Sequence, residues 1–123
     1  MPELIEKDLS YAIVGEAYKV RDALGYGFLE KVYENALIVG LREIGLLVEQ
    51  QFPMEVRYHG VIVGTYYADI VVERRIIIEV KACERIIKAH LSQTLNYLQA
   101  TGLKLGLVIN FNNERVDVEG VVN

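Results

Sequence analysis

The sequence has little of what staples or anchors a small protein. Cys83 is the one cysteine among 123 residues, so it cannot form an internal disulfide, and it lacks partners for a zinc ribbon or an iron–sulfur cluster within this chain. No apolar run approaches the ~20 residues needed to span a bilayer. The first residues also lack the basic start and apolar run of a secretory signal. We therefore expect a cytoplasmic protein that does not use a membrane.

Positive charge is also scarce. Lys and Arg number 13 against 17 Asp and Glu, a net charge of −4. A protein that coats nucleic acid or an anionic membrane needs the opposite excess, which excludes that mode of binding. Residues 74–104 are an exception, because they hold six Lys and Arg against two acids, a local +4. Any contact with nucleic acid must then be local, and the sequence shows no aromatic platform of the kind that single-strand binders use.

The apolar content is sufficient for one modest core. Hydrophobic residues make up 52% of the chain and charged residues 24%, which excludes a mainly disordered protein. We find no internal repeat and no linker. The length and composition predict a single domain over residues 1–123.

Apolar spacings of three and four residues predict three helices. The first covers Ile5–Leu24 and ends at the Gly25-Tyr26-Gly27 break, and the second covers roughly Leu29–Ile44, with Gly45 as its stop. A third helix is expected over Glu84–Ala100, which ends at Thr101-Gly102.

The strands between and after these helices define the fold class. Phe52–Tyr58 alternates in polarity, with Met54, Val56 and Tyr58 expected to point inward. Val61–Val72 and Ile76–Lys81 complete an antiparallel three-strand meander. The buried strand Leu105–Ile109 follows the third helix, which suggests a parallel return by a right-handed crossover, and the tail from Phe111 is expected to add an edge strand. The prediction is a mixed α/β (α+β) fold, in which helices flank a mixed sheet.

The third strand of the meander carries charge where burial is expected. Glu79 and Lys81 are two residues apart and so share a face. If 73–75 is a three-residue loop, Val72 opposes Ile76, and Asp69 then lies across from Glu79. Two such carboxylates repel, raise each other's proton affinity and are best relieved by a cation. A two-residue loop would reverse this parity. A structural salt bridge, in which Lys81 neutralises one acid, is an equal alternative.

Three segments together resemble a known family. Asp69 followed by Glu79-Val80-Lys81 resembles the signature of the PD-(D/E)XK nuclease superfamily, although its proline is absent. Residues 27–33, with Gly27, Glu30 and Tyr33, are similar to the motif that names the small GxxExxY proteins, and Gln93 to Tyr97 resembles the QxxxY motif of RecB-like nucleases. The resemblance extends from about Ile13 to Phe111 and implies a restriction-endonuclease-like core.

The same resemblance implies a chemistry. Asp69, Glu79 and Glu30 would be metal-binding carboxylates, and Lys81 would position the attacking water and steady the developing charge on phosphate. Mg²⁺ or Mn²⁺ suits such an oxygen-rich site. The implied function is a metal-dependent nuclease that hydrolyses phosphodiester bonds, those of DNA in preference to those of RNA.

Further residues are expected to line the cleft or to contact substrate: Gln93, Tyr97, Tyr33, His90, Arg74 and Arg75. Each has a structural alternative. Tyr33 and Tyr97 could be core residues, His90 a surface residue, and the arginine pair a solvated turn, while the carboxylate of Glu30 suits a helix N-terminus in any case.

Two other functions remain open. One is a non-catalytic domain that binds nucleic acid or a protein, and the other is a scaffold that dimerises through the apolar face of the first helix. Relatives tend to carry a basic pair near the C-terminus where this chain has Val118-Glu119-Gly120, which weakens the case for substrate contact by the tail. Because the chain is small, we also expect a homodimer or a partner protein to assist recognition.

Overall fold

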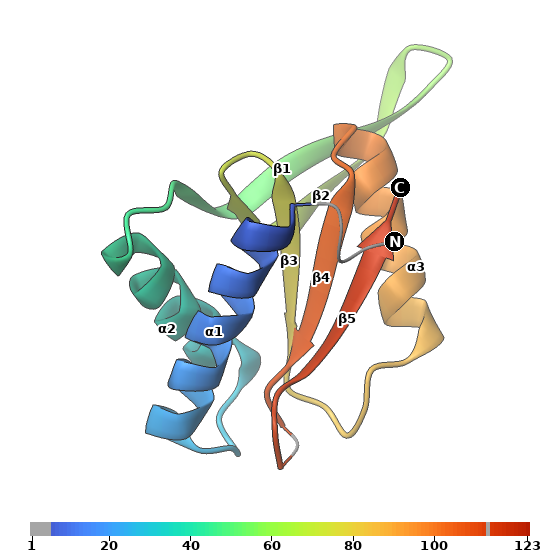
Figure 1. Ribbon diagram of the computed structural model, residues 1–123. Helices are drawn as coiled ribbons and strands as arrows, with labels where there is room; N and C mark the ends of the chain where they lie inside the picture. The colour runs from blue at the N-terminus through green and yellow to red at the C-terminus, as the bar shows by residue number, and fades with distance from the viewer. Residues whose placement is uncertain (1–5, 113) are drawn as a thin grey trace.

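The computed structural model describes residues 6–112 and 114–123, which form a mixed α/β fold in three layers (Figure 1). Helices α1 and α2 cover one face of a five-stranded sheet, and α3 covers the other. The elements in chain order are α1 (Lys7–Leu24), α2 (Glu30–Glu43), β1 (Val48–Tyr58), β2 (Val61–Val72), β3 (Ile76–Lys81), α3 (Lys88–Thr101), β4 (Leu105–Asn110) and β5 (Asp117–Val122). In the described residues no helix is long and apolar enough to span a membrane.

The sheet has the order β1-β2-β3-β4-β5. Strands β1, β2 and β3 form the predicted antiparallel meander, and β4 lies parallel to β3 after the crossover through α3. The expected edge strand is also present, because β5 pairs antiparallel with β4. The predicted meander, parallel strand and edge strand are therefore confirmed.

Two element boundaries differ from the prediction by four residues, and others differ by one. Strand β1 begins at Val48, ahead of the expected Phe52, because Val48 pairs with Val72 at the end of β2. Helix α3 begins at Lys88 instead of Glu84, since Ile87 has an extended backbone with φ −112° and ψ 165°. Ile5, the expected start of the first helix, lies outside the described residues.

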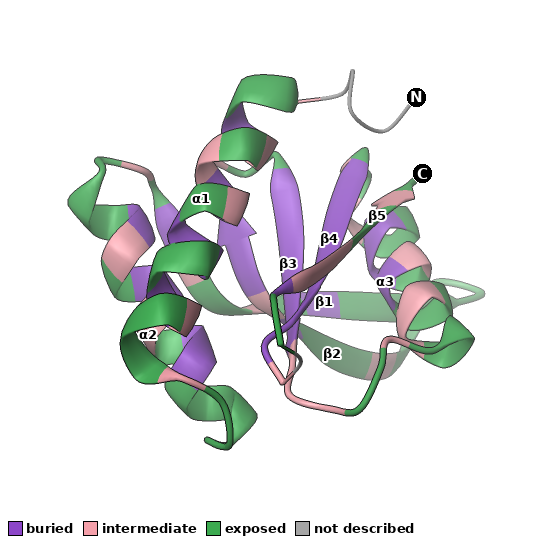
Figure 2. Cartoon of the chain, turned by 60° about the horizontal axis from the view of Figure 1, so that its bottom comes forward, coloured by how far each residue is buried: buried purple, intermediate pink, exposed green. Residues whose placement is uncertain are grey.

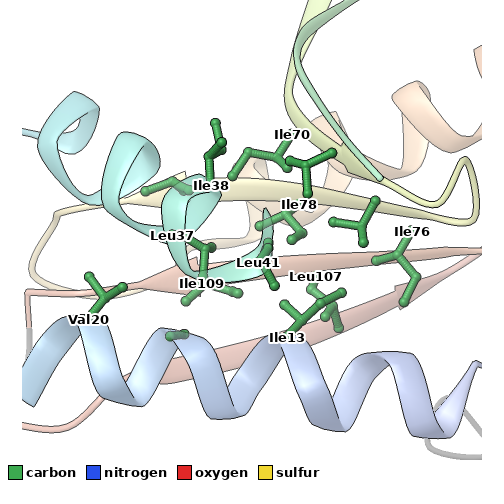
Figure 3. Packing of buried hydrophobic residues seen from close by; sticks show 14 of the residues in the cluster. Ile13, Val20, Leu37, Ile38, Leu41, Ile70, Ile76, Ile78, Leu107 and Ile109 are labelled. Atoms are coloured by element: carbon green, nitrogen blue, oxygen red, sulfur yellow. The ribbon is translucent and has the colours of Figure 1, made fainter. Parts of the chain in front are cut away.

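The core consists of two clusters, one on each side of the sheet. The larger cluster packs α1 and α2 against the sheet, with residues such as Ile13, Leu41 and Ile78 completely buried (Figure 3). The smaller cluster joins β1, β2 and β3 to α3 through Met54, Ile77 and other residues. Strands β3 and β4 are consequently buried over nearly their whole length (Figure 2).

This packing corrects two expectations. The apolar face of α1 is buried in the larger cluster, so it is not free to dimerise and the scaffold hypothesis loses its interface. Val56 and Tyr58 do not point into the core, because 39% and 66% of their surfaces are exposed. The distal part of the β1–β2 hairpin projects beyond the layers that would cover it (Figure 1).

Candidate active site

The site lies where β2 and β3 separate. Their ladder pairs Val72 with Ile76 and continues to Ile70 and Ile78, which confirms the three-residue connection. Beyond that point two carboxylates lie between the strands. The backbone N–H of Asp69 donates to Glu79 Oε2 at 2.8 Å, and the N–H of Val80 donates to Asp69 Oδ2 at 2.8 Å. Asp69 and Glu79, here called the acid pair, are thus side by side.

A change of face at Asp69 explains this arrangement. Ile70 and Val72 belong to the α1–α2 side of the core, whereas Ala68 belongs to the α3 side together with Val71. Strict alternation would place Ala68 on the same side as Ile70. The alternation is therefore interrupted at Asp69. On the neighbouring strand, Gln51 adopts φ 52°, an unusual backbone conformation for a residue other than glycine.

Burial makes the acid pair electrostatically unfavourable. Glu79 is only 4% exposed, and this burial, followed by the repulsion from Asp69, raises its pKa to about 8. Burial also raises the pKa of Asp69, against the opposing effect of the hydrogen bond from Val80. Two neighbouring acids that ionise reluctantly form a place where a cation is favoured.

Lys81 ends β3 beside this pair and is partly buried. Its charge lowers the pKa of both acids, although less strongly than burial raises them. Within the described residues, however, Lys81 forms no ion pair. The structural salt bridge that we considered as an alternative is therefore not formed, and Lys81 acts on the acid pair from a distance.

Glu30 does not join the acid pair. It is the first residue of α2, it is exposed, and its charge is the weakest of the influences that raise the pKa of Asp69. In the described part of the chain, no group of three or more His, Cys, Asp and Glu side chains is close enough to hold a metal ion. The structure thus brings together two of the three expected carboxylate ligands.

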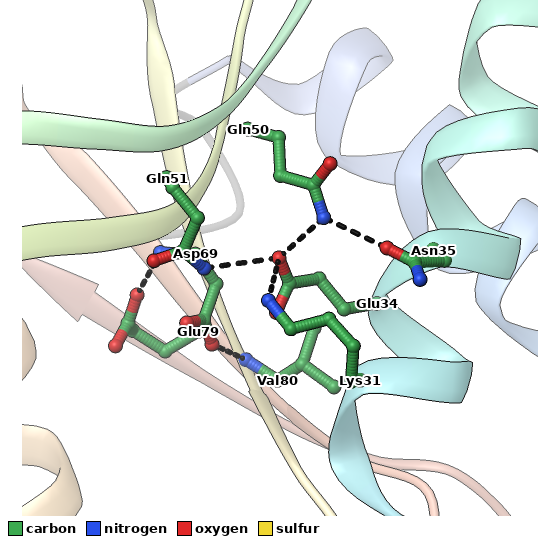
Figure 4. A network of polar contacts seen from close by, with 8 residues as sticks. All are labelled: Lys31, Glu34, Asn35, Gln50, Gln51, Asp69, Glu79 and Val80. Atoms are coloured by element: carbon green, nitrogen blue, oxygen red, sulfur yellow. Dashed lines mark hydrogen bonds and ion pairs between the residues drawn. The ribbon is translucent and has the colours of Figure 1, made fainter.

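Among the acids outside the pair, Glu34 has the largest effect on the pKa values of Asp69 and Glu79, and the sequence analysis missed it. Only 3% of its surface is exposed, and its charge raises the pKa of Asp69 more than that of Glu30 does. Glu34 Oε2 accepts hydrogen bonds from Gln50 at 2.7 Å and Gln51 at 3.0 Å and pairs with Lys31 at 3.2 Å (Figure 4). A signal existed in the sequence, since residue 34 lies one turn after Glu30 on the buried side of the helix.

Helix α3 brings three predicted residues toward the site. Tyr97 is 8% exposed, and its pKa is raised by burial and then by the charges of Glu79 and Asp69. Gln93 is exposed and lines a groove together with Tyr97. His90 has a structural role, because its Nδ1 accepts the N–H of Ile87 at 3.1 Å at the start of α3. Burial and then the charge of Lys81 lower the pKa of His90.

Three predicted residues lie elsewhere. Tyr33 is completely buried, donates its hydroxyl to the Gly25 carbonyl at 2.7 Å and stacks on Phe111. It is therefore a core residue that fixes the turn before α2, not a residue of the cleft. Arg74 and Arg75 lie in the β2–β3 turn, at the opposite end of β3 from Glu79, where Arg74 pairs with Glu49 and Arg75 with Glu6. Their side chains are engaged in these pairs, away from the acid pair.

Comparison with known proteins places the chain in a family. A family model described as the PD-(D/E)XK nuclease superfamily matches residues 7–121, and the chain belongs to that superfamily. The fold is also similar to the crystal structure of SSO0001, with a TM-score of 0.59 at 17% sequence identity. The match covers 96% of this chain but 59% of the other, so this chain spans about three fifths of that protein. No curated protein matches the sequence.

Proposed function

We propose that this protein is a metal-dependent nuclease of the GxxExxY branch that hydrolyses phosphodiester bonds in DNA, with RNA as the less favoured substrate. Membership of the nuclease superfamily supports this proposal. The observation that carries it is the acid pair itself. The buried Glu79 and the partly buried Asp69 both have raised pKa values, and Lys81 beside them forms no ion pair within the described residues that would neutralise them.

The acid pair has the chemistry that a hard divalent cation requires. In each carboxylate one oxygen accepts a backbone N–H, whereas the other accepts no hydrogen bond within the described residues and is not sealed from solvent. Backbone hydrogen bonds of this kind fix the direction of a ligand. Mg²⁺ is commonly held by one or two carboxylates, with water and substrate phosphate as its other ligands, so Asp69 and Glu79 suffice for Mg²⁺ or Mn²⁺. When bound, such an ion makes a water more acidic and neutralises phosphate charge.

The other residues would orient the substrate. The ammonium of Lys81 is free to donate to a phosphate oxygen or to the attacking water, and it supplies positive charge where negative charge develops. Tyr97 forms the adjoining wall with its hydroxyl near the acid pair, and Gln93 offers an amide at the surface. Glu30, the exposed first residue of α2, would act as a ligand only after α2 or its side chain moves closer to the acid pair.

That position of Glu30 favours a second candidate function. A domain that binds nucleic acid or a protein without cleaving it has no need of a third carboxylate, and in the described residues three acids do not converge. The two functions differ in one measurable property. Both permit binding, but only the nuclease requires the acid pair and Lys81 for turnover.

The test combines metal titration with cleavage. Mn²⁺ or Mg²⁺ is titrated by calorimetry, and cleavage is followed on single-stranded, duplex and structured DNA and RNA. We expect Asp69→Ala to abolish metal binding and cleavage, and Lys81→Ala to retain metal but to lose activity by about 100-fold or more. Lys104→Ala, which removes an exposed lysine elsewhere, is the matched control. Equal cleavage by all variants would identify a contaminant, and metal-independent binding without cleavage would favour the second function.

A further inference from the structure

A groove of about 910 Å³ runs between α3 and the β1–β2 hairpin. Two buried residues, Met54 and Tyr97, line it together with Tyr66 of the hairpin. Tyr97 also lies within the electrostatic influence of Glu79 and Asp69. Tyr97 packs in one cluster with Ala68, the neighbour of Asp69, and with Ile77 of β3, so the groove adjoins the acid pair on the α3 side of the sheet.

Uncharged amides form the α3 wall of this groove. Gln93, Asn96 and Gln99 are spaced three residues apart, line the groove and are exposed. Within the described residues their side chains form no hydrogen bond, so their donors and acceptors are available to a ligand. Each amide offers both kinds of group, as do the edges of nucleobases.

The structure also supplies an aromatic surface that the sequence did not reveal. Tyr66 is 50% exposed, and its ring centroid lies 6.1 Å from that of Tyr97, with the planes tilted by 43°. Strand β2 and helix α3 thus bring together two aromatic rings that are distant in the sequence. A half-exposed tyrosine ring beside amides can stack on an unpaired base.

The distribution of charge around the groove favours a single strand over a duplex as its ligand. Glu55 and Arg57 are the charged residues that line this groove, and they pair with each other at 3.2 Å. Arg85 and Lys88, near the start of α3, are exposed and form no ion pair in the described part of the chain. A duplex hides the Watson–Crick edges and the faces of its bases, and it would press phosphates against a wall on which the charged side chains already pair with each other. A single strand can insert its bases and leave its phosphates to Arg85 and Lys88.

We infer that the groove between α3 and the β1–β2 hairpin binds single-stranded nucleic acid through its bases and leads the strand to the acid pair. The delivery of the strand to the acid pair rests on the proposed nuclease function, which this inference deepens. Binding itself does not depend on catalysis. It can therefore be measured separately, with the chelator EDTA present to prevent cleavage.

The experiment measures fluorescence anisotropy of a labelled twelve-nucleotide oligothymidylate and of the corresponding duplex. We expect the single strand to bind more tightly than the duplex. Tyr66→Ala should weaken binding of the single strand by about tenfold, the loss expected for one base–aromatic stack. Gln99→Glu places a carboxylate in the groove at an exposed helical position and should also weaken binding. This second variant keeps the test valid if Tyr66→Ala folds poorly.

Tyr67→Ala is the matched control, because Tyr67 is 53% exposed but follows Tyr66 on β2 and so points to the opposite face. The inference is overturned if this control weakens binding as much as Tyr66→Ala, or if the duplex binds as tightly as the single strand. It is also overturned if no single strand binds and Tyr66→Ala converts a dimer into a monomer in light scattering, which would assign the groove to a second copy. If both groove variants cleave duplex DNA as well as the wild type does, the proposed role of the groove is refuted and the nuclease function is retained. Binding that depends on the groove residues, without cleavage in Mn²⁺, would refute the nuclease function but retain the groove as a binding site.

Discussion

In the absence of divalent cations the protein should lose stability as the pH rises from 5 to 9. Glu79 has an ordinary pKa of 4.5 in the unfolded chain and about 8 in the folded protein, so the folded state holds a proton that the unfolded state releases over this range. Stability falls wherever the native state binds more protons. At about 1.4 kcal/mol per pH unit, the difference between the two pKa values corresponds to at most about 5 kcal/mol above pH 8. The raised pKa of Asp69 acts in the same direction.

The assay is urea unfolding at pH 5, 7 and 9 in EDTA, for the wild type and Glu79→Gln. Glutamine can still accept the N–H of Asp69, but it carries no charge, so the variant should be more stable than the wild type at pH 9 and nearly equal to it at pH 5. Glu55→Gln, which removes an exposed acid, should follow the wild type. A wild-type stability that rises between pH 5 and 9, or an unchanged pH dependence in Glu79→Gln, would refute the electrostatic reasoning.

Three further predictions concern the surroundings of the site. Gly106→Ala should destabilise the protein by about 1–3 kcal/mol in chemical denaturation, because the new Cβ would lie 2.6 Å from Cγ2 of the buried Thr94. Tyr33→Phe should cost about 1 kcal/mol through loss of the hydrogen bond to Gly25, with metal binding unchanged in calorimetry. Glu34→Gln should reduce the loss of stability between pH 5 and 9, because it removes a charge that raises the pKa values of both acids. An unchanged pH profile would show that Glu34 is electrostatically separate from them.

The register of the acid pair was predictable because it depends on local features of the chain. Three polar residues separate two apolar strands, and the length of that connection fixes which residues oppose each other. Val72 opposes Ile76 in the structure, which places Asp69 beside Glu79. The strand order followed for a similar reason, since a helix between two strands favours a parallel crossover.

The features that the sequence did not predict depend on tertiary contacts. The burial of Glu34 requires α2 to pack so that Gln50 and Gln51 of β1 reach its carboxylate. The change of face at Asp69 leaves no mark on the polarity pattern of the sequence. The pairing of Tyr66 with Tyr97 likewise joins separate elements across a groove. The sequence also left the role of His90 open. Its ring caps the start of α3 because the extended backbone of Ile87 directs an N–H toward Nδ1 of His90.

The cost of the acid pair is itself an argument for function. Glu79 lies between the apolar residues Ile78 and Val80 in a strand whose other positions, apart from Lys81, are fully buried apolar side chains. A buried charge without a partner destabilises a fold, and an apolar residue of similar volume would commonly be more stable. Lys81 lowers the pKa of both acids but forms no ion pair with either within the described residues, so the compensation for the repulsion between Asp69 and Glu79 is only partial. Repulsion that is only partly compensated is typical of sites that are completed by a ligand. A divalent cation bound to substrate phosphate would supply the missing charge, and in that case Glu79→Gln should remove the stabilisation that Mn²⁺ confers on the wild type at pH 8.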